Sequence, residues 1–215
     1  MTKIRVGLNG FGRIGRCVTR ILAEEENVEL VAINHCGAIE YMCYKLKYDS
    51  THGTFKGTAS PAEDGNLMLN GKKVHVFSTR YIFITLEFSL LASETSKSST
   101  GHLSASITSS TRPASSTTST NVSRTSTTAQ KKVIITAPSP DAPMFVYGVN
   151  HEQYSSDMKI ISNASCTTNC LAPVVKILHD KFGIQEALMT TIHSYTASQM
   201  LVDGSSKGKK VKFWF

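Results

Sequence analysis

The segment Ile4-Arg5-Val6-Gly7-Leu8-Asn9-Gly10-Phe11-Gly12-Arg13-Ile14-Gly15 decides the fold. Residues 4–9 form a short β-type run, residues 10–15 have the pattern G-x-G-x-x-G, and helical spacing follows over 14–23. The first glycine of such a pattern permits a tight turn, the second lets the backbone approach a pyrophosphate, and the third lets helix and strand pack closely. The helix N-terminus then offers N–H groups and a positive dipole to phosphates. The pattern is a weak signal alone, but after a strand and before a helix it favours a dinucleotide-binding turn over a plain one.

A second strand is predicted over residues 28–34, and the residues at its end bear on the ligand. In dinucleotide-binding folds, an acidic residue about 20 residues after the glycines binds the hydroxyls of the adenosine ribose. Asn34 and His35 occupy this place. Because an imidazole cannot accept both ribose hydroxyls as a carboxylate does, the sequence leaves the binding of this ribose open.

The chain divides into three blocks of unlike composition. The first and last blocks read as α/β protein, with further strands predicted over 73–77, 133–136 and 188–193 and a helix over 170–182. Between them, residues 93–128 are mostly Ser and Thr. Such a composition cannot bury enough apolar surface to offset its ordering entropy. We therefore expect residues 81–130 to be an aberrant, disordered segment.

The overall composition favours a basic soluble enzyme. The 215 residues carry a net charge of +7, which also fits a nucleic-acid or membrane partner. The chain contains no apolar run of about 18 residues and no signal peptide, so we expect a cytoplasmic protein without a membrane partner. The five cysteines have no CxxC pair, so neither a disulfide framework nor a metal site is expected. Basic and aromatic residues interleave over 207–215, but one such cluster makes nucleic-acid binding the weaker alternative.

The segment Ser162-Asn163-Ala164-Ser165-Cys166-Thr167-Thr168-Asn169-Cys170 is a candidate nucleophile block. It lies between an extended segment and a helix, where the dipole and free N–H groups favour a thiolate and can hold an oxyanion. His193 is a candidate base or ion-pair partner for Cys166. From spacing alone, a buried structural cysteine and a core histidine are an equal alternative. Cys170, one helical turn further on, is expected to pack.

These motifs together resemble glyceraldehyde-3-phosphate dehydrogenase, the phosphorylating glycolytic family. The resemblance covers residues 1–80 and 131 to about 204, and the block around Cys166 is highly specific to the family. The segments that carry it are residues 6–16, 48–53, 135–139, 142–145, 164–173 and 193 with 196–199. It implies an α/β fold in which a Rossmann-type doubly wound NAD-binding domain, residues 1–165, precedes the truncated start of an α+β catalytic domain, residues 166–215.

The resemblance also implies the chemistry and its residues. Cys166 would attack the aldehyde of glyceraldehyde 3-phosphate, and His193 would activate the thiol and move the proton. Hydride would pass to NAD, and inorganic phosphate would cleave the thioester to give 1,3-bisphosphoglycerate. The positions that match cofactor-binding residues are Asn9, Gly10, Phe11, Gly12, Arg13, Ile14, Gly15, Asn34, Arg80 and Thr136, and those that match substrate- or phosphate-binding residues are Ser165, Thr167, Thr196 and Ser198. The resemblance also implies a homotetramer, since the family's members assemble as homotetramers. In this chain, His35 replaces the Asp that binds the ribose in the family.

The middle block is open to a different interpretation. When residues 106–116 are read in a shifted frame, their codons permit Asp-Tyr-Val-Val-Asp-Ser-Thr-Gly-Val-Phe, which matches the family's own strand. We interpret residues 81–93 as a retained intron and residues 93–130 as out-of-frame sequence, and residues 205–215 as a possible second shift. Sequencing the transcript tests this interpretation. The alternative function is therefore a catalytically inactive dinucleotide-fold fragment from a mis-spliced or frameshifted gene, unstable and without NAD-dependent activity when expressed.

Overall fold

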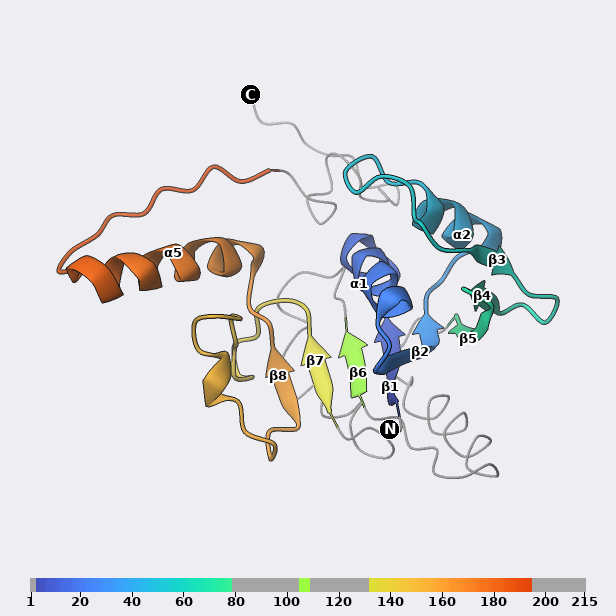
Figure 1. Cartoon of the computed structure of the whole chain (residues 1–215), viewed down its shortest axis with the longest axis horizontal. Helices are drawn as coiled ribbons and strands as arrows, with labels where there is room; N and C mark the ends of the chain where they lie inside the picture. The colour runs from blue at the N-terminus through green and yellow to red at the C-terminus, as the bar shows by residue number, and fades with distance from the viewer. Residues whose placement is uncertain (1–2, 79–104, 109–131, 195–215) are drawn as a thin grey trace, which may run out of the picture.

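The computed structural model describes residues 3–78, 105–108 and 132–194, and strands and helices alternate in it as far as residue 47 (Figure 1). The strands are β1 (Ile4–Asn9), β2 (Val28–Asn34), β3 (Ala59–Pro61), β4 (Leu67–Leu69), β5 (Lys72–Phe77), β6 (Ala105–Thr108), β7 (Val133–Ile135) and β8 (Ile160–Ser162). The helices are α1 (Arg13–Glu24), α2 (Ile39–Lys47) and α5 (Cys166–Phe182), with a 3₁₀ turn at His151–Gln153. No helix in these described ranges is long and apolar enough to cross a membrane.

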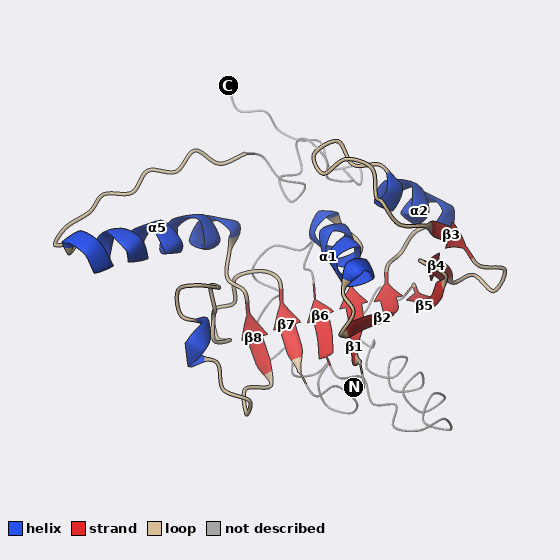
Figure 2. Cartoon of the chain, in the orientation of Figure 1, coloured by secondary structure: helices blue, strands red, loops and turns tan. Residues whose placement is uncertain are grey.

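All eight strands lie in one sheet, in the order β3-β4-β5-β2-β1-β6-β7-β8 (Figure 2). The strands from β5 to β8 pair in parallel, whereas β3, β4 and β5 pair antiparallel at one edge. The chain moves outward from β1 through β2 to β5 on one side and from β6 through β7 to β8 on the other. The order therefore reverses between β1 and β6, as in a doubly wound sheet, and ligands of such sheets bind outside the carboxyl ends of the strands at the reversal. The predicted Rossmann-type fold is confirmed.

Helix α1 packs on the sheet through its smallest residues. Gly15 is buried in its first turn, and Thr19 is fully buried one turn later, with its hydroxyl donating to the Gly15 carbonyl oxygen at 2.8 Å. The burial of Gly15 is consistent with the role of the third glycine of such a turn, which is to let helix and strand pack closely. The core under the helices contains Leu8, Phe11, Leu30, Ile33, Met42, Leu46, Phe55, Leu67, Leu69 and Val74.

The expectation of disorder for residues 81–130 is wrong for four of them. Residues 105–108 form β6, which pairs in parallel with β1 on one side and with β7 on the other. A gap between β1 and β7 would leave two rows of buried backbone N–H and C=O groups without partners, which costs free energy at each group. A segment of any composition can form this strand if its backbone N–H and C=O groups bond to those of β1 and β7. The rest of 81–130 lies outside the described residues, as does the divergent tail at 205–215.

The strand predicted over 188–193 does not form. The structure has no regular element there, and the side chains of Leu188 and Ile192 are 96% and 101% exposed. Within the described ranges, no neighbouring strand pairs with this segment. A segment of strand-forming residues becomes a strand only where backbone partners exist, and Figure 2 draws this segment as a loop that follows α5.

Candidate active site

The glycine turn has the backbone geometry that a close approach to phosphate requires. Gly10 has φ of 102°, in the region that favours glycine, and its N–H donates to the Asn34 carbonyl oxygen at 2.9 Å. The Asn34 side-chain amide donates to Asn9 Oδ1 at 3.0 Å, so the ends of β1 and β2 are tied together beyond the sheet. Gly12 is the N-cap of α1, and no side chain caps the helix there. The N–H groups at the start of α1 are therefore left for a ligand's phosphates, so these residues fit a dinucleotide.

The other residues predicted in this turn differ in their exposure and in their contacts. Phe11 is fully buried in the core, whereas Ile14 is half-exposed in the first turn of α1. Arg13 is the first residue of α1, and its guanidinium donates to Asp49 at 2.8 Å and to the Thr51 hydroxyl at 2.6 Å. The turn thus presents backbone groups at its centre and an arginine beside them.

Asp49 holds this arginine in place, a role that the sequence did not predict. Its side chain is only 6% exposed and accepts backbone hydrogen bonds from Thr51 and His52, both at 2.9 Å. The His52 N–H, the Thr51 N–H and the charge of Arg13 hold the pKa of Asp49 below its ordinary value. Asp49 is therefore ionised at neutral pH and fixes Arg13 next to the glycine turn.

Thr136 and the nucleophile block meet at the same edge of the sheet. Thr136 directly follows β7, and the block directly follows β8, the neighbouring parallel strand. The Ser162 hydroxyl donates to the Ala137 carbonyl oxygen at 2.6 Å, and the Asn163 N–H donates to the Ile135 carbonyl oxygen at 3.1 Å. Because the carboxyl ends of parallel strands share one edge, these residues lie on the edge that also carries the glycine turn (Figure 1).

A short, sharp turn carries the chain from β8 into α5. Ala164 is buried and has φ of 63°, a left-handed conformation that is uncommon for a residue with a side chain. The Ser165 hydroxyl then accepts the Thr168 N–H at 2.9 Å and caps the helix. The Asn169 amide closes the turn by donating to the carbonyl oxygens of Asn163 and Ser165, at 2.7 and 2.8 Å. These contacts make Cys166 the first residue of α5, as the sequence predicts.

The chain after α5 returns to the start of the helix. Gly183, with φ of 69°, ends the 17-residue helix, which is about 25 Å long. The extended residues that follow are enough to span that length, and they bring His193 back to Cys166. The His193 Nε2 lies 3.0 Å from the Cys166 Sγ. A nucleophile and a base that are 27 positions apart in sequence are therefore in hydrogen-bonding contact.

Each member of this pair shifts the other's ionisation. The hydrogen bond from His193 is the main cause that lowers the pKa of the Cys166 thiol, and hydrogen bonds from Thr167 act in the same direction. The hydrogen bond to Cys166 is likewise the main cause that raises the pKa of His193. His193 Nδ1 lies 2.5 Å from the Ser194 carbonyl oxygen, which can only accept, so Nδ1 carries a proton and Nε2 faces the thiol. Both pKa shifts move the pair towards a thiolate beside an imidazolium.

Some predicted residues are not brought into this site. Cys170 is exposed among the described residues, so the expectation that it packs is wrong there. Arg80, Thr196 and Ser198 lie outside the described residues. No group of three or more His, Cys, Asp or Glu side chains that could hold a metal ion occurs in 3–78, 105–108 or 132–194.

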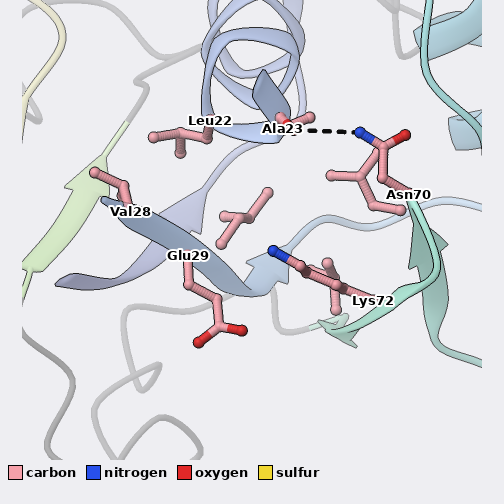
Figure 3. Close-up of a pocket in the computed structure, with 9 residues that line it drawn as sticks. Leu22, Ala23, Val28, Glu29, Asn70 and Lys72 are labelled. Carbon is pink, nitrogen blue, oxygen red and sulfur yellow. Dashed lines mark hydrogen bonds between the residues drawn. The ribbon is translucent and has the colours of Figure 1, made fainter. Parts of the chain in front are cut away.

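A pocket at the opposite edge of the sheet does not belong to this site. It lies between the end of α1, at Leu22 and Ala23, and the start of β2, at Val28 (Figure 3). Asn70 bridges its rim by donating to the Ala23 carbonyl oxygen at 3.2 Å. Because the glycine turn and Cys166 lie at the carboxyl ends of the strands, this pocket at an amino end is separate from both.

Comparisons with known proteins agree with this geometry. Residues 4–105 match the family model described as glyceraldehyde 3-phosphate dehydrogenase, NAD binding domain, and residues 165–212 match the model of its C-terminal domain. The chain is 49% identical over 202 residues, 94% of its length, to glyceraldehyde-3-phosphate dehydrogenase of the yeast Ogataea parapolymorpha. It is 48% identical over 205 residues to a chloroplastic enzyme of Arabidopsis thaliana and 45% identical over 208 residues to a cytosolic enzyme of Gracilaria gracilis, covering 95% and 96% of this chain.

The chain spans about half the length of the curated relatives it matches, since the alignments cover 56%, 45% and 58% of those three proteins. The two family models nevertheless match both the segment that carries the glycine turn and the segment that carries Cys166 and His193. The chain belongs to the glyceraldehyde-3-phosphate dehydrogenase family.

Proposed function

We propose that the chain performs the chemistry of its family, the NAD-dependent oxidation and phosphorylation of glyceraldehyde 3-phosphate to 1,3-bisphosphoglycerate. The observation that carries the proposal is the 3.0 Å contact between Cys166 Sγ and His193 Nε2 at the start of α5. A thiolate at a helix N-terminus beside a histidine is suited to attack a carbonyl carbon, because the dipole and the imidazolium both stabilise its negative charge.

The pair begins the reaction by forming a bond between sulfur and carbon. The Cys166 thiolate adds to the aldehyde carbon, and the carbonyl oxygen takes a proton from the His193 imidazolium. His193, now neutral, removes that proton again as the carbon loses hydride, and a thioester on Cys166 results. When bound, the nicotinamide of NAD accepts this hydride. An oxygen of inorganic phosphate then attacks the thioester carbon, the carbon–sulfur bond breaks, and the acyl phosphate leaves the thiolate free.

The start of α5 supplies the groups that would stabilise the developing charge. Cys166 is its first residue, so its own backbone N–H has no partner within the helix and can donate to the oxyanion. Thr167 is half-buried beside the thiol, whereas the Ser165 hydroxyl is held by Thr168. We assign Ser165, Thr167, Thr196 and Ser198 to the substrate and inorganic phosphate.

The glycine turn would hold the cofactor at the same edge of the sheet. The free N–H groups after Gly12 and the fixed guanidinium of Arg13 suit a pyrophosphate, and Thr136 lies beside the nucleophile block, where the nicotinamide must approach. The proposed cofactor-binding residues are Asn9, Gly10, Phe11, Gly12, Arg13, Ile14, Gly15, Asn34, Arg80 and Thr136.

The domain boundary, assembly and location are part of the same proposal. We place the NAD-binding domain at residues 1–165 and the start of the catalytic domain at 166–215, because the model of the C-terminal domain begins at residue 165. Homotetramer formation and a cytoplasmic location are expected from the family, whose relatives named above include both cytosolic and chloroplastic enzymes.

A non-catalytic dinucleotide-fold fragment is the second candidate. The observation that favours it is the exposure of the segment that carries His193, where Leu188 and Ile192 contact almost nothing among the described residues. A base on an unsupported segment is poorly positioned, and loose positioning lowers catalytic rates steeply.

One experiment separates the two candidates. The 215-residue chain is incubated with glyceraldehyde 3-phosphate, NAD and inorganic phosphate, and NADH formation is followed by absorbance. The proposed function predicts turnover that depends on phosphate, disappears in Cys166→Ser and persists in Cys170→Ser, because Cys170 lies outside the thiol–imidazole contact. The absence of NADH formation from folded protein would favour the non-catalytic candidate.

A further inference from the structure

The side chain of Asn169 makes contacts that its place in the helix does not require. Asn169 is the fourth residue of α5 and is exposed. Asparagine is a poor helix former, so at an exposed helical position it stabilises the helix less than alanine would. Its amide nevertheless donates to the carbonyl oxygens of Asn163 and Ser165, at 2.7 and 2.8 Å. The amide therefore organises the turn that carries Cys166.

The bond to Ser165 falls on the peptide unit next to the nucleophile. The Ser165 carbonyl oxygen and the Cys166 N–H belong to one peptide bond. That oxygen accepts the Asn169 backbone N–H at 2.9 Å, as α-helix geometry requires, and the Asn169 side-chain amide at 2.8 Å. A carbonyl oxygen has two lone pairs, so both are occupied. One residue thus supplies both hydrogen bonds to the carbonyl behind the Cys166 N–H.

The starts of the other two described helices differ in this respect. At the start of α1, the Gly12 carbonyl oxygen accepts the Arg16 N–H at 3.0 Å. At the start of α2, the Ala38 carbonyl oxygen accepts the Met42 N–H at 3.0 Å. No side chain in the described part of the chain adds a second bond to either oxygen. Among the described helices, the doubly bonded carbonyl therefore belongs to the one that begins with a cysteine.

Hydrogen bonds to a carbonyl oxygen polarise the whole peptide unit. Electron density moves towards the oxygen, so the N–H at the other end of the unit becomes a stronger donor. The Cys166 N–H has no partner within the helix, because Cys166 is the first residue of α5. It is therefore available to the oxygen on which negative charge develops when the thiolate attacks a carbonyl carbon. Asn169 acts on this donor through the Ser165 carbonyl.

The second bond of the amide fixes the direction of the same peptide unit. Ala164 lies between Asn163 and Ser165 and is buried with φ of 63°. A residue with a side chain persists in this strained conformation only where its surroundings hold it. The Asn169 amide spans Ala164 by binding the carbonyl oxygens on both sides of it. The orientation of the Cys166 N–H is thus tied to the turn between β8 and α5.

We propose that Asn169 is a positioning residue that orients and polarises the Cys166 N–H as an oxyanion donor. The inference rests on the part of the proposed function that makes Cys166 the nucleophile, and it concerns the attack of sulfur on a carbonyl carbon. Reactions of Cys166 that form an oxyanion should depend on Asn169, whereas reactions of the same sulfur that form none should depend on it little.

Two reagents separate these two kinds of reaction. With p-nitrophenyl acetate, the Cys166 thiolate adds to the ester carbon and the carbonyl oxygen becomes an oxyanion. The C=O bond then re-forms as p-nitrophenolate leaves, and a thioester results. With iodoacetamide, the same thiolate displaces iodide and no oxyanion forms. Both rate constants are measured at one pH on the 215-residue chain, acylation by the absorbance of p-nitrophenolate and alkylation by mass spectrometry of the Cys166 peptide, and Cys166→Ser gives the background.

Asn169→Ala should slow acylation by about tenfold and alkylation by less than about twofold. The expected loss is smaller than the roughly 10²–10³-fold loss when a whole oxyanion donor is removed, because the Cys166 N–H remains. Asn169→Gln keeps an amide and should recover part of the acylation rate. Asn70→Ala is the matched control, because it removes an exposed bond from an asparagine amide to the Ala23 carbonyl oxygen at the opposite edge of the sheet, and both rates should stay unchanged.

Several results would overturn the inference. Equal slowing of acylation and alkylation in Asn169→Ala would show a merely structural role, and an unchanged acylation rate would show none. No recovery in Asn169→Gln, or no acylation of Cys166 in the unsubstituted chain, would also contradict it. Failure of the proposed function is a separate result: NADH formation would be absent, while the dependence of acylation on Asn169 would still support the positioning role.

Discussion

Replacement of Arg20 by alanine should release the segment that fixes Arg13. Arg20 lies on α1, and its guanidinium donates to the Leu46 carbonyl oxygen at 2.6 and 3.2 Å and to the Gly53 carbonyl oxygen at 2.9 Å. Weaker contacts reach the carbonyl oxygens of Lys47 and His52 at 3.5 and 3.4 Å. One side chain therefore ties α1 to both the end of α2 and the loop that carries Asp49.

The expected loss follows from these contacts. The bonds to Leu46 are partly buried, and a hydrogen bond from a charged donor contributes about 1.5–3 kcal/mol. The bond to Gly53 is exposed and adds only about 0.5 kcal/mol, because water replaces it. The guanidinium also lies 5.8 Å from the centre of the Phe55 ring, which adds about 0.5 kcal/mol. We expect Arg20→Ala to lower the free energy of unfolding by about 2.5–4 kcal/mol, at the upper end of the range for single substitutions.

Urea denaturation followed by circular dichroism measures this loss. Arg20→Lys should lose only about half of the free energy of unfolding that Arg20→Ala loses, because an ammonium reaches one carbonyl oxygen but cannot span two. Ile21→Ala is the control on the same helix, and we expect it to change stability little, since Ile21 is 59% exposed. A loss below about 0.5 kcal/mol for Arg20→Ala, or equal losses for the Ala and Lys variants, would refute the reasoning.

Three further predictions concern the turn, the core and a surface carboxylate. Gly10→Ala, at φ of 102°, should strain the turn by about 1 kcal/mol or more and weaken ADP binding measured by calorimetry; unchanged binding would contradict the role of the turn. Leu46→Ala removes a fully buried side chain and should lower the free energy of unfolding in urea by about 2–5 kcal/mol, whereas a loss under 1 kcal/mol would place Leu46 outside the core. A hydrogen bond with Lys73 lowers the pKa of Asp64 to about 2, below its unfolded value of 3.8. The ionised Asp64 therefore stabilises the fold above pH 3.8, and this contribution is lost as the pH falls towards 2. Asp64→Asn should make the free energy of unfolding less dependent on pH between these values. NMR titration of the Asp64 carboxyl should show the low pKa.

Much of the nucleotide half of the fold could be predicted from sequence. The predicted bounds of β1 and β2 agree with the structure, because each strand is a run of apolar residues bounded by Asn or Gly and buried in the sheet. The glycine turn was predicted from its spacing together with the strand before it and the helix after it, which are all local features of the sequence. Local sequence likewise placed Cys166 at a helix N-terminus. The helix begins at Cys166, four residues before the predicted start at residue 170, because the Ser165 hydroxyl caps it there.

Other elements depend on partners that a local pattern does not reveal. Helix α2 was not predicted: Met42 and Leu46 are its buried residues, whereas Tyr41 and Tyr44 remain exposed and obscure its apolar face. The three-residue strands β3 and β4 form only by pairing with one another and with β5. Conversely, residues 188–193 have a composition that suits a strand but no partner strand in the described structure. Strand β6 has an unpromising composition but two partner strands. In each case the neighbouring backbone, rather than the segment itself, decided the outcome.

The site shows the same division. The motif predicted which backbone groups would face a phosphate, but Asp49 and Arg20 became visible only when the fold brought residues 46–53 against α1. The contact between Cys166 and His193 likewise needs the full length of α5 and the returning chain. Spacing alone left a buried structural cysteine as an equal alternative, and the exposed thiol in contact with an imidazole contradicts that alternative.

The reactivity of Cys166 as a function of pH tests the central claim most directly. The rate of alkylation by iodoacetamide is measured on the Cys166 peptide by mass spectrometry, for the 215-residue chain and for His193→Gln. Because His193 lowers the pKa of the Cys166 thiol, the chain should react with an inflection below that of an ordinary cysteine, and His193→Gln should move the inflection up towards about 8.5. The same inflection in both proteins would contradict a thiolate–imidazolium pair at the start of α5.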